Sequence, residues 1–285
     1  MTIGTLLQIL NALSFSALLF IVASGFTLIF GLLRVVNLAH GALYLLGGYI
    51  GMTVTVATGS FLAGILGAAG IIAFVGFCLD RWLLEYVKDS ELKQVLLTLG
   101  VAMLLNDQAL VIWGGDARTI PVPELLQGAA RIGSLYYPKY RLAVLMSGLL
   151  IFVLLWLGYN RTRLGALIRA GVDDQEMVQA TGVDIRRLFV LTFMLGSALA
   201  GIAGMLGGAF LTLYPGADAE ILVFGLAIVI IGGRGSLVGA AVGSLLVGFL
   251  ATFGQVWFPE LSYFIIFGPM AILLAFRPLG LFGRA

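Results

Sequence analysis

Charged residues are scarce in this sequence. Asp, Glu, Lys and Arg make up 11% of the 285 residues, whereas 61% are hydrophobic. Soluble globular domains carry about 25% charged residues, so water could not solvate a surface built from this chain. The mean hydropathy of +1.10 likewise predicts that lipid solvates most of it. The net charge of +2 comes without a basic patch interleaved with aromatics, so no nucleic-acid partner is expected.

Cysteine and histidine are almost absent, with one residue of each. Cys78 cannot form an intramolecular disulfide, so cysteine usage does not indicate a redox compartment. One Cys and one His do not make the usual ligand set of a metal site. The chain also lacks a nucleophile-and-base constellation and the GxxxxGK[ST] phosphate loop. We therefore expect no enzyme, no bound cofactor and no metal site in this chain.

Long apolar runs, by contrast, are abundant, and a membrane-spanning helix needs about 20 such residues. The predicted fold class is all-α: a polytopic transmembrane helical bundle of eight or nine spans with glycine-rich helix breaks. Residues 1–285 form a single membrane domain, because no loop is long enough for a soluble catalytic domain. The shortest run, 220–232, is interpreted as half of a broken helix or a tilted segment. The runs fall near 7–30, 41–58, 62–80, 94–113, 142–159, 188–211, 220–232, 237–256 and 262–276.

The few basic residues gather in particular loops and predict an orientation. Cytoplasmic loops concentrate Lys and Arg, so we place the arginine-rich segment 160–187 and the C-terminal tail in the cytoplasm. Alternation of spans then places 81–93 inside, and 114–141 and the N-terminus outside. This arrangement leaves all but four of the 16 basic residues on the inner side.

Ionisable residues are nearly missing from the centres of the predicted spans. Asp107, Asp218 and Glu220 lie near the outer ends of theirs. Proton- or sodium-driven carriers place acidic residues inside the membrane, so this chain offers no internal energy source. If it pumps, a partner must supply the work. A self-contained channel or secondary carrier for a small solute such as urea or an amide is the alternative, and a membrane enzyme or scaffold is a third class.

The loop TRLGALIRAGVDDQEMVQATGVDIRRLF, residues 162–189, is where a partner could act. Asp173 is placed to cap a short helix, with Asp174 and Glu176 at its positive end. Glu176 follows Asp173 at the capping-box spacing, and Gly182 predicts a left-handed turn that ends the helix. A helix of about two turns is marginal in water, so it is expected to dock on something. An ordinary amphipathic loop on the bilayer surface is the simpler alternative.

The only histidine stands in GLLRVVNLAHGALYLLGGYIG, residues 31–51. In one interpretation the chain turns at the membrane surface there, with Arg34 at lipid phosphate and Asn37 capping the next helix. In the other, Asn37, His40 and Gly41 form a helix break that lines a translocation path. Polar backbone at membrane depth is tolerated only where it lines a cavity or is buried in protein. We favour a structural role at the break, with contact to the pathway as the alternative.

Glycines recur in LGSALAGIAGMLGG (195–208) and GGRGSLVGAAVGSLLVG (232–248). Small residues on one helix face let backbones approach closely, and helix packing is the simplest explanation for most of them. The pairs at 47–48 and 232–233 are also candidates for helix breaks where a pathway needs exposed backbone. Gly232, Gly233 and Ser236 therefore form a second candidate break.

Four segments together resemble a known family: GLLRVVNLAHG, the loop 162–189, LGSALAGIAG and IIGGRGSLVGAAVG, in this order. They are similar to the LivH/LivM-type permeases, the membrane subunits of bacterial ABC importers for branched-chain amino acids. The resemblance spans roughly 25–285, and NLAHG is closer to the LivH branch. Two departures, Ala42 after AHG and the lack of Lys or Arg in AEILVFG, bear on the substrate more than on the mechanism.

The resemblance implies that this chain is half of a transmembrane dimer in the bacterial inner membrane, often a heterodimer with a LivM-like permease. Two cytoplasmic ATPase subunits, which hold ATP and Mg, would drive it. A periplasmic or extracellular solute-binding protein would deliver an amino acid or another small polar solute. The loop at 160–187 would be the coupling segment that enters a groove on the ATPase. Its candidate residues are Arg169, Asp173, Asp174, Glu176, Ala180 and Gly182.

Overall fold

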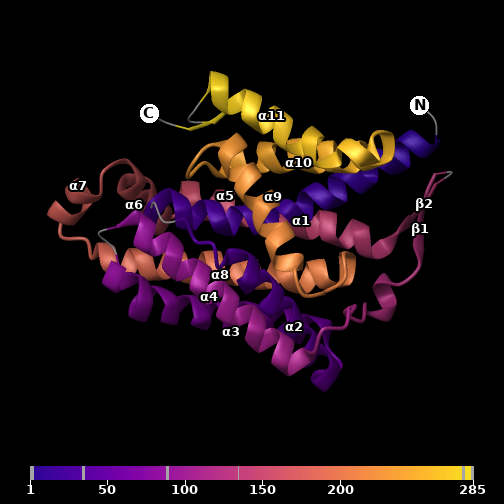
Figure 1. The fold of residues 1–285 in the computed structure, drawn as a ribbon, viewed down its shortest axis with the longest axis horizontal. Helices are drawn as coiled ribbons and strands as arrows, with labels where there is room; N and C mark the ends of the chain where they lie inside the picture. The colour runs from indigo at the N-terminus through magenta and orange to yellow at the C-terminus, as the bar shows by residue number, and fades with distance from the viewer. Residues whose placement is uncertain (1–2, 34–35, 88–89, 134, 278–279, 284–285) are drawn as a thin grey trace.

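Helices make up nearly all of the regular structure in the computed structural model, which describes residues 3–33, 36–87, 90–133, 135–277 and 280–283 (Figure 1). Within these residues, one two-stranded hairpin accompanies them. In chain order the elements are α1 (Ile3–Leu33), α2 (His40–Thr58), α3 (Phe61–Cys78), the π-helical turn η1 (Leu79–Leu83), the 3-10 turn η2 (Leu84–Val87), α4 (Glu91–Trp113), the 3-10 turn η3 (Glu124–Leu126), β1 (Ala129–Ile132), β2 (Leu135–Pro138), α5 (Lys139–Arg161), α6 (Arg163–Asp173), α7 (Gln175–Ala180), α8 (Ile185–Phe210), α9 (Ala217–Gly232), α10 (Leu237–Trp257), the 3-10 turn η4 (Pro259–Leu261) and α11 (Ser262–Phe276).

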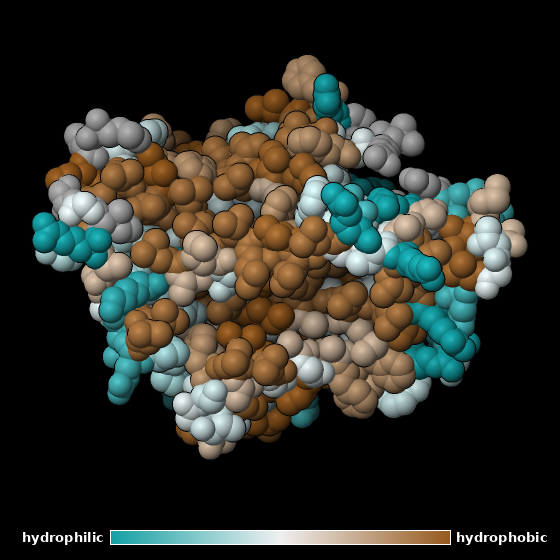
Figure 2. Space-filling model, turned by 180° about the vertical axis from the view of Figure 1, so that it is seen from behind, coloured by the Kyte–Doolittle hydropathy of each residue, from teal (hydrophilic) through white to brown (hydrophobic). Residues whose placement is uncertain are grey.

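The apolar runs of the sequence all form helices, so the predicted all-α polytopic bundle is confirmed. Within the described ranges, seven helices are long and apolar enough to cross a membrane: α1, α2, α3 with its η1–η2 extension, α4, α5, α8 and α10. Helices α9 and α11 are shorter, with 16 and 15 residues. The predicted eight or nine spans thus become seven long helices and two short ones. Apolar residues dominate the middle of the surface, and polar residues flank it at both ends (Figure 2).

Successive membrane helices, with the short α9 included, run in alternating directions, so their connections gather at two ends of the bundle (Figure 1). The basic end carries 79–87, α6, α7 and the connection 233–236. The hairpin end carries the β1–β2 hairpin and the loop 211–216. At the basic end, Glu85 pairs with Arg81 at 2.8 Å and also with Arg186 at the start of α8. The basic loops near 81–93 and 160–187 therefore lie at the same end, as their charge predicted.

Helix α8 lies at the centre of the core and packs against α1, α2 and α3 through glycines. A Cβ on Gly47 of α2 would lie 2.5 Å from Cα of Gly201 on α8, and a Cβ on Gly48 would lie 2.9 Å from the Gly204 carbonyl. The helix-break interpretation of the 47–48 pair is wrong, because both residues lie within α2. These glycines instead let two helix backbones approach closely.

The hairpin end is closed by contacts between segments far apart in the sequence. Strands β1 and β2 pair antiparallel, with Ala130 opposite Tyr137. The buried Tyr137 hydroxyl donates to Asn11 Oδ1 on α1 at 3.2 Å. The loop before the hairpin is tied to the end of α8, where Arg118 and Leu213 exchange backbone hydrogen bonds of 2.8 and 2.7 Å. These contacts fix the segments at this end of the bundle, where a cavity opens.

Candidate functional site

The connection between α1 and α2 enters the bundle instead of turning at its surface. Helix α1 ends at Leu33, yet His40, the first residue of α2, bonds through Nε2 to the carbonyl of Val22 at 3.0 Å. Val22 lies eleven residues before the end of α1, which is about 16 Å at 1.5 Å per residue. Helix α2 therefore begins deep in the bundle, which does not fit the surface-turn interpretation. Arg34, the third polar residue of this stretch, lies outside the described residues.

Asn37 and His40 hold this break in place. Each is only 1% exposed. Asn37 Oδ1 accepts from the Ala39 amide at 3.1 Å, and the Leu38 amide donates to Thr98 Oγ1 of α4 at 3.2 Å. The His40 ring meets the Phe26 ring edge-on, with centroids 5.3 Å apart. A carbonyl can only accept, so Nε2 of His40 carries the proton in its bond to α1.

Gly41 continues the break by bringing α2 against α9. A Cβ there would lie 2.9 Å from the Leu222 side chain and closer still to the backbone of Asp218. Asp218 is buried in the first turn of α9 and accepts from Asn106 Nδ2 of α4 at 2.6 Å. The first break is thus the point where α2, α4 and α9 are fixed relative to one another.

The second candidate break separates α9 from α10. Gly233 adopts φ +95°, a conformation that favours glycine, and Ser236 Oγ caps α10 by accepting from the Gly239 amide at 3.0 Å. The C-terminal tail covers the end of α9. The Phe282 amide donates to the Gly232 carbonyl at 3.1 Å, and the neighbouring Leu281 amide bonds Ile231 at 2.9 Å. The tail therefore satisfies carbonyls that a helix end leaves free.

The predicted coupling segment folds into two short helices at the basic end. Helix α7 begins after Asp174, whose Oδ1 accepts from the Met177 amide at 3.0 Å. The prediction that Asp173 provides this cap is wrong by one residue, because α6 continues through Asp173 before the chain turns. The structure describes the backbone of Asp173 but not its side chain. The predicted left-handed turn at Gly182 is confirmed, with φ +85°.

Contacts with the bundle hold this segment at its base and leave its outer face open. The Arg169 guanidinium lies over the Tyr159 ring of α5, 5.1 Å from its centroid. Val178 of α7 is buried, at 6% exposure. Glu176 and Ala180, by contrast, are exposed. Helices α6 and α7 stand out from the end of the bundle (Figure 1).

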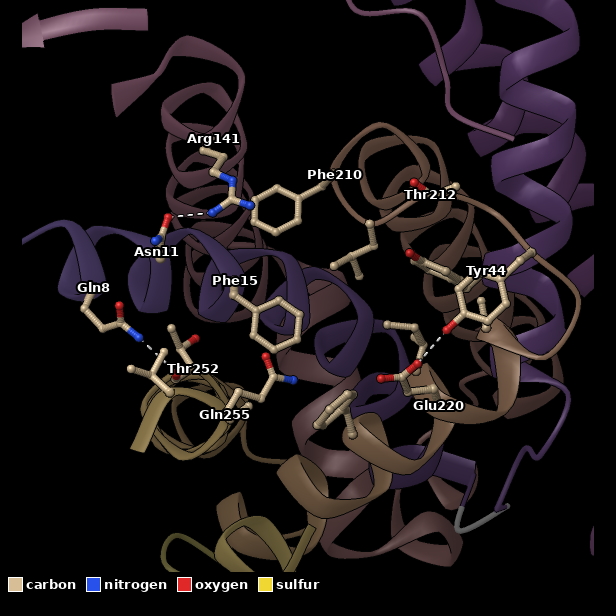
Figure 3. Close-up of a pocket in the computed structure, with 17 residues that line it drawn as sticks. Gln8, Asn11, Phe15, Tyr44, Arg141, Phe210, Thr212, Glu220, Thr252 and Gln255 are labelled. Carbon is tan, nitrogen blue, oxygen red and sulfur yellow. Dashed lines mark hydrogen bonds between the residues drawn. The ribbon is translucent and has the colours of Figure 1, made fainter. Parts of the chain in front are cut away.

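A cavity of about 410 Å³ opens at the hairpin end between α1, α5, α8, α9 and α10 (Figure 3). Arg141 and Glu220 supply charges of opposite sign, and Phe15 and Phe210 supply apolar surface. Tyr44, one helical turn after His40, also lines it, so the first break positions part of its wall. The residues predicted at the two breaks are not among those that line it.

Sequence reasoning missed most of this cavity. Glu220 was noted at the outer end of its span, but Arg141 was counted only as part of a loop. The sequence did contain a signal for this cavity, because it predicts both charges at span ends on the same side of the membrane. Elsewhere in the described part of the chain, no three His, Cys, Asp or Glu residues lie together in a way that could hold a metal ion.

The family model described as "Branched-chain amino acid transport system / permease component" matches residues 8–274. The chain belongs to this family. The resemblance carried by its four sequence segments is thereby confirmed, and the protein is a multi-pass membrane permease subunit.

Several transport permeases are similar to this family member over most of their length. The high-affinity branched-chain amino acid transport system permease protein BraD of Pseudomonas aeruginosa is 26% identical over 294 residues, covering 97% of this chain and 95% of BraD. LivH of Escherichia coli is 26% identical over 296 residues with the same coverage. The ribose import permease protein RbsC of Escherichia coli is 24% identical, covering 87% of this chain and 77% of RbsC. No solved structure matches the chain.

Proposed function

We propose that this permease forms half of the translocation pathway of an ATP-driven importer for a branched-chain or related amino acid. The observation that carries the proposal is the exposed α6–α7 segment at the basic end. Met177 and Leu164 are 64% and 51% exposed on it, and large apolar side chains exposed on a protruding segment favour a docking surface. The family match and the amino-acid transport named in BraD and LivH support the substrate class.

The proposed partners follow from this role. Two ATPase subunits bind ATP and Mg and dock on α6–α7, and a LivM-like permease supplies the other half of the pathway. A periplasmic or extracellular solute-binding protein delivers the solute to the hairpin end. The chain itself hydrolyses no ATP and binds no cofactor. Its location is the bacterial inner membrane, with the basic end and the C-terminus in the cytoplasm, which the excess of Lys and Arg at that end supports.

Uptake in proteoliposomes tests this proposal. The chain is coexpressed with the ATPase and permease genes beside its own, and assayed with and without the neighbouring binding protein. The panel contains amino acids, urea and small carboxylates. We expect uptake that requires both ATP and the binding protein and that is greatest for amino acids. Uptake by this chain alone, without ATP, would overturn the proposal in favour of a channel or carrier.

A second experiment tests the docking role of α6–α7. Charge reversal at Asp173 and Glu176, each changed to Lys, should weaken copurification of the ATPase subunits and lower uptake. Glu124→Lys at the hairpin end is the control, because it reverses one acidic charge at the opposite end of the bundle. Unchanged copurification and uptake in the double variant would count against coupling through this segment.

A further inference from the structure

The cavity at the hairpin end holds charged side chains of both signs that do not pair with each other. Arg141 lies in the first turn of α5 and Glu220 in the first turn of α9. Figure 3 shows them on opposite sides of the cavity. The ion pairs found among the described residues lie at the basic end and involve neither of them. Two such charges in one cavity suit a ligand that carries both signs.

Contacts with its neighbours hold Arg141 in a fixed orientation. Its guanidinium stacks over the Phe210 ring, 4.8 Å from the centroid, and its Nη1 donates to Asn11 Oδ1 at 2.5 Å. Asn11 is fixed in turn by the Tyr137 hydroxyl. A guanidinium has five N–H donors, so most of them stay available for a ligand. Its planar fork matches a carboxylate, which it binds through two parallel hydrogen bonds.

Glu220 presents a carboxylate on the other side of the cavity. Its Oε2 accepts from the Tyr214 hydroxyl at 2.8 Å, which fixes the side chain near the loop that follows α8. An ionised carboxylate has about four lone-pair positions, so it can accept further hydrogen bonds. This wall of the cavity therefore attracts an ammonium group and repels a second carboxylate.

Aromatic rings supply the surface between the two charges. The Phe15 ring stacks with Phe210 at 6.5 Å between centroids and meets Phe224 edge-on at 5.8 Å. A hydrocarbon side chain is stabilised by burying its surface against such rings. The volume of about 410 Å³ lies within the range of about 300–1,000 Å³ typical of small-molecule sites.

We propose that this cavity binds a zwitterionic solute with an apolar side chain during import. The carboxylate contacts the Arg141 guanidinium, the ammonium is turned toward Glu220, and the side chain packs on Phe15 and its neighbouring rings. A solute with only one sign of charge finds one attractive and one repulsive wall, which is how such a site rejects it. The assignment rests on the proposed function, because it takes the hairpin end as the side where solute arrives.

Equilibrium binding tests the site without the solute-binding protein. The assembled importer, with its partner permease and ATPases, is placed in nanodiscs and titrated with radiolabelled L-leucine, leucinamide or 4-methylpentanoate. Leucinamide lacks the carboxylate, and 4-methylpentanoate lacks the ammonium. The variants are Arg141→Gln and Glu220→Gln. Their matched controls at the same end are Lys139→Gln and Glu260→Gln, which remove one charge each outside the cavity.

We expect wild-type protein to bind leucine more tightly than either analogue. Arg141→Gln should weaken binding of leucine and 4-methylpentanoate about tenfold or more and leave leucinamide unchanged, since the charge-assisted hydrogen bonds from the guanidinium to the carboxylate are lost. Glu220→Gln should weaken binding of leucine and leucinamide but not of 4-methylpentanoate. Both control variants should bind as wild type does.

Two results would overturn the site. One is that the Arg141→Gln variant either keeps wild-type affinity for all three probes or loses affinity for all three equally. An equal loss is expected if Arg141 only holds Asn11 and the hairpin in place. The other is that wild-type nanodiscs bind no leucine. In the second case, ATP-dependent uptake that requires the binding protein would still support the proposed function. Failure of the site and failure of the function are thus told apart.

Discussion

The cap of α7 offers a quantitative test of coupling. Asp174 Oδ1 accepts from the Met177 amide at 3.0 Å, at the start of a helix of only six residues. Replacing a capping Asp by Ala costs about 1 kcal/mol, whereas Asn caps about as well as Asp. A change of that size shifts an equilibrium about fivefold. If folded α7 is the form that docks, Asp174→Ala should lower the affinity for the ATPase subunits by up to about fivefold.

The measurement is a titration of purified ATPase subunits onto the permease in nanodiscs, followed by fluorescence. Asp174→Asn is the matched control, since it keeps the cap and removes only the charge. We expect the Asn variant to bind as wild type does and the Ala variant to bind more weakly, with uptake reduced in proportion. Wild-type affinity in the Ala variant would refute the reasoning. An equal loss in both variants would assign the effect to charge instead of helix capping.

Three further predictions concern the bundle itself. Gly47→Ala should lower the melting temperature in detergent, because overpacking costs about 1–3 kcal/mol and its Cβ would lie 2.5 Å from a backbone atom of α8. The Gly70→Ala variant, whose Cβ would meet nothing within 4 Å, should keep the wild-type melting temperature. Equal melting temperatures of the two variants would disprove the close approach at Gly47. His40→Ala should reduce stability and uptake while the complex still assembles, because the bond to α1 and the buried ring are lost; normal uptake would exclude any role of His40 in the pathway. A double-mutant cycle of Asp218→Ala and Asn106→Ala should give a coupling energy of about 1–2 kcal/mol from their hydrogen bond, and strictly additive losses would contradict that contact.

The helix break at 36–39 shows which features the sequence predicts and which depend on tertiary contacts. The cluster of Asn37 and His40 indicated an irregular backbone, because polar groups inside a membrane need partners. The long-range partners of this break are a carbonyl of α1 and a hydroxyl of α4: the His40 ring bonds to Val22, and the Leu38 amide donates to Thr98. Those residues are 18 and 60 positions away from their partners along the chain. No local pattern specifies such a meeting.

The two glycine pairs also show that a local sequence pattern does not decide a residue's structural role. The pair at 47–48 and the pair at 232–233 look alike in sequence, yet the first lies inside a helix and the second at a helix end. A glycine without a Cβ permits both a close helix contact and a positive φ. The residue opposite decides between them, and at Gly47 that residue is Gly201 on another helix.

The amino-acid sequence by itself determined that lipid surrounds most of the chain and that the fold is a helical bundle. Apolar runs of about 20 residues form membrane helices whatever surrounds them, since every backbone polar group must be paired in lipid. It also placed the short helix of the coupling segment within one residue, because capping and left-handed turns are local. Only the tertiary structure decided the cavity at the hairpin end. Its walls come from six helices spread over the whole chain, and Arg141 and Glu220 face one space only because α5 and α9 begin at the same end of the bundle.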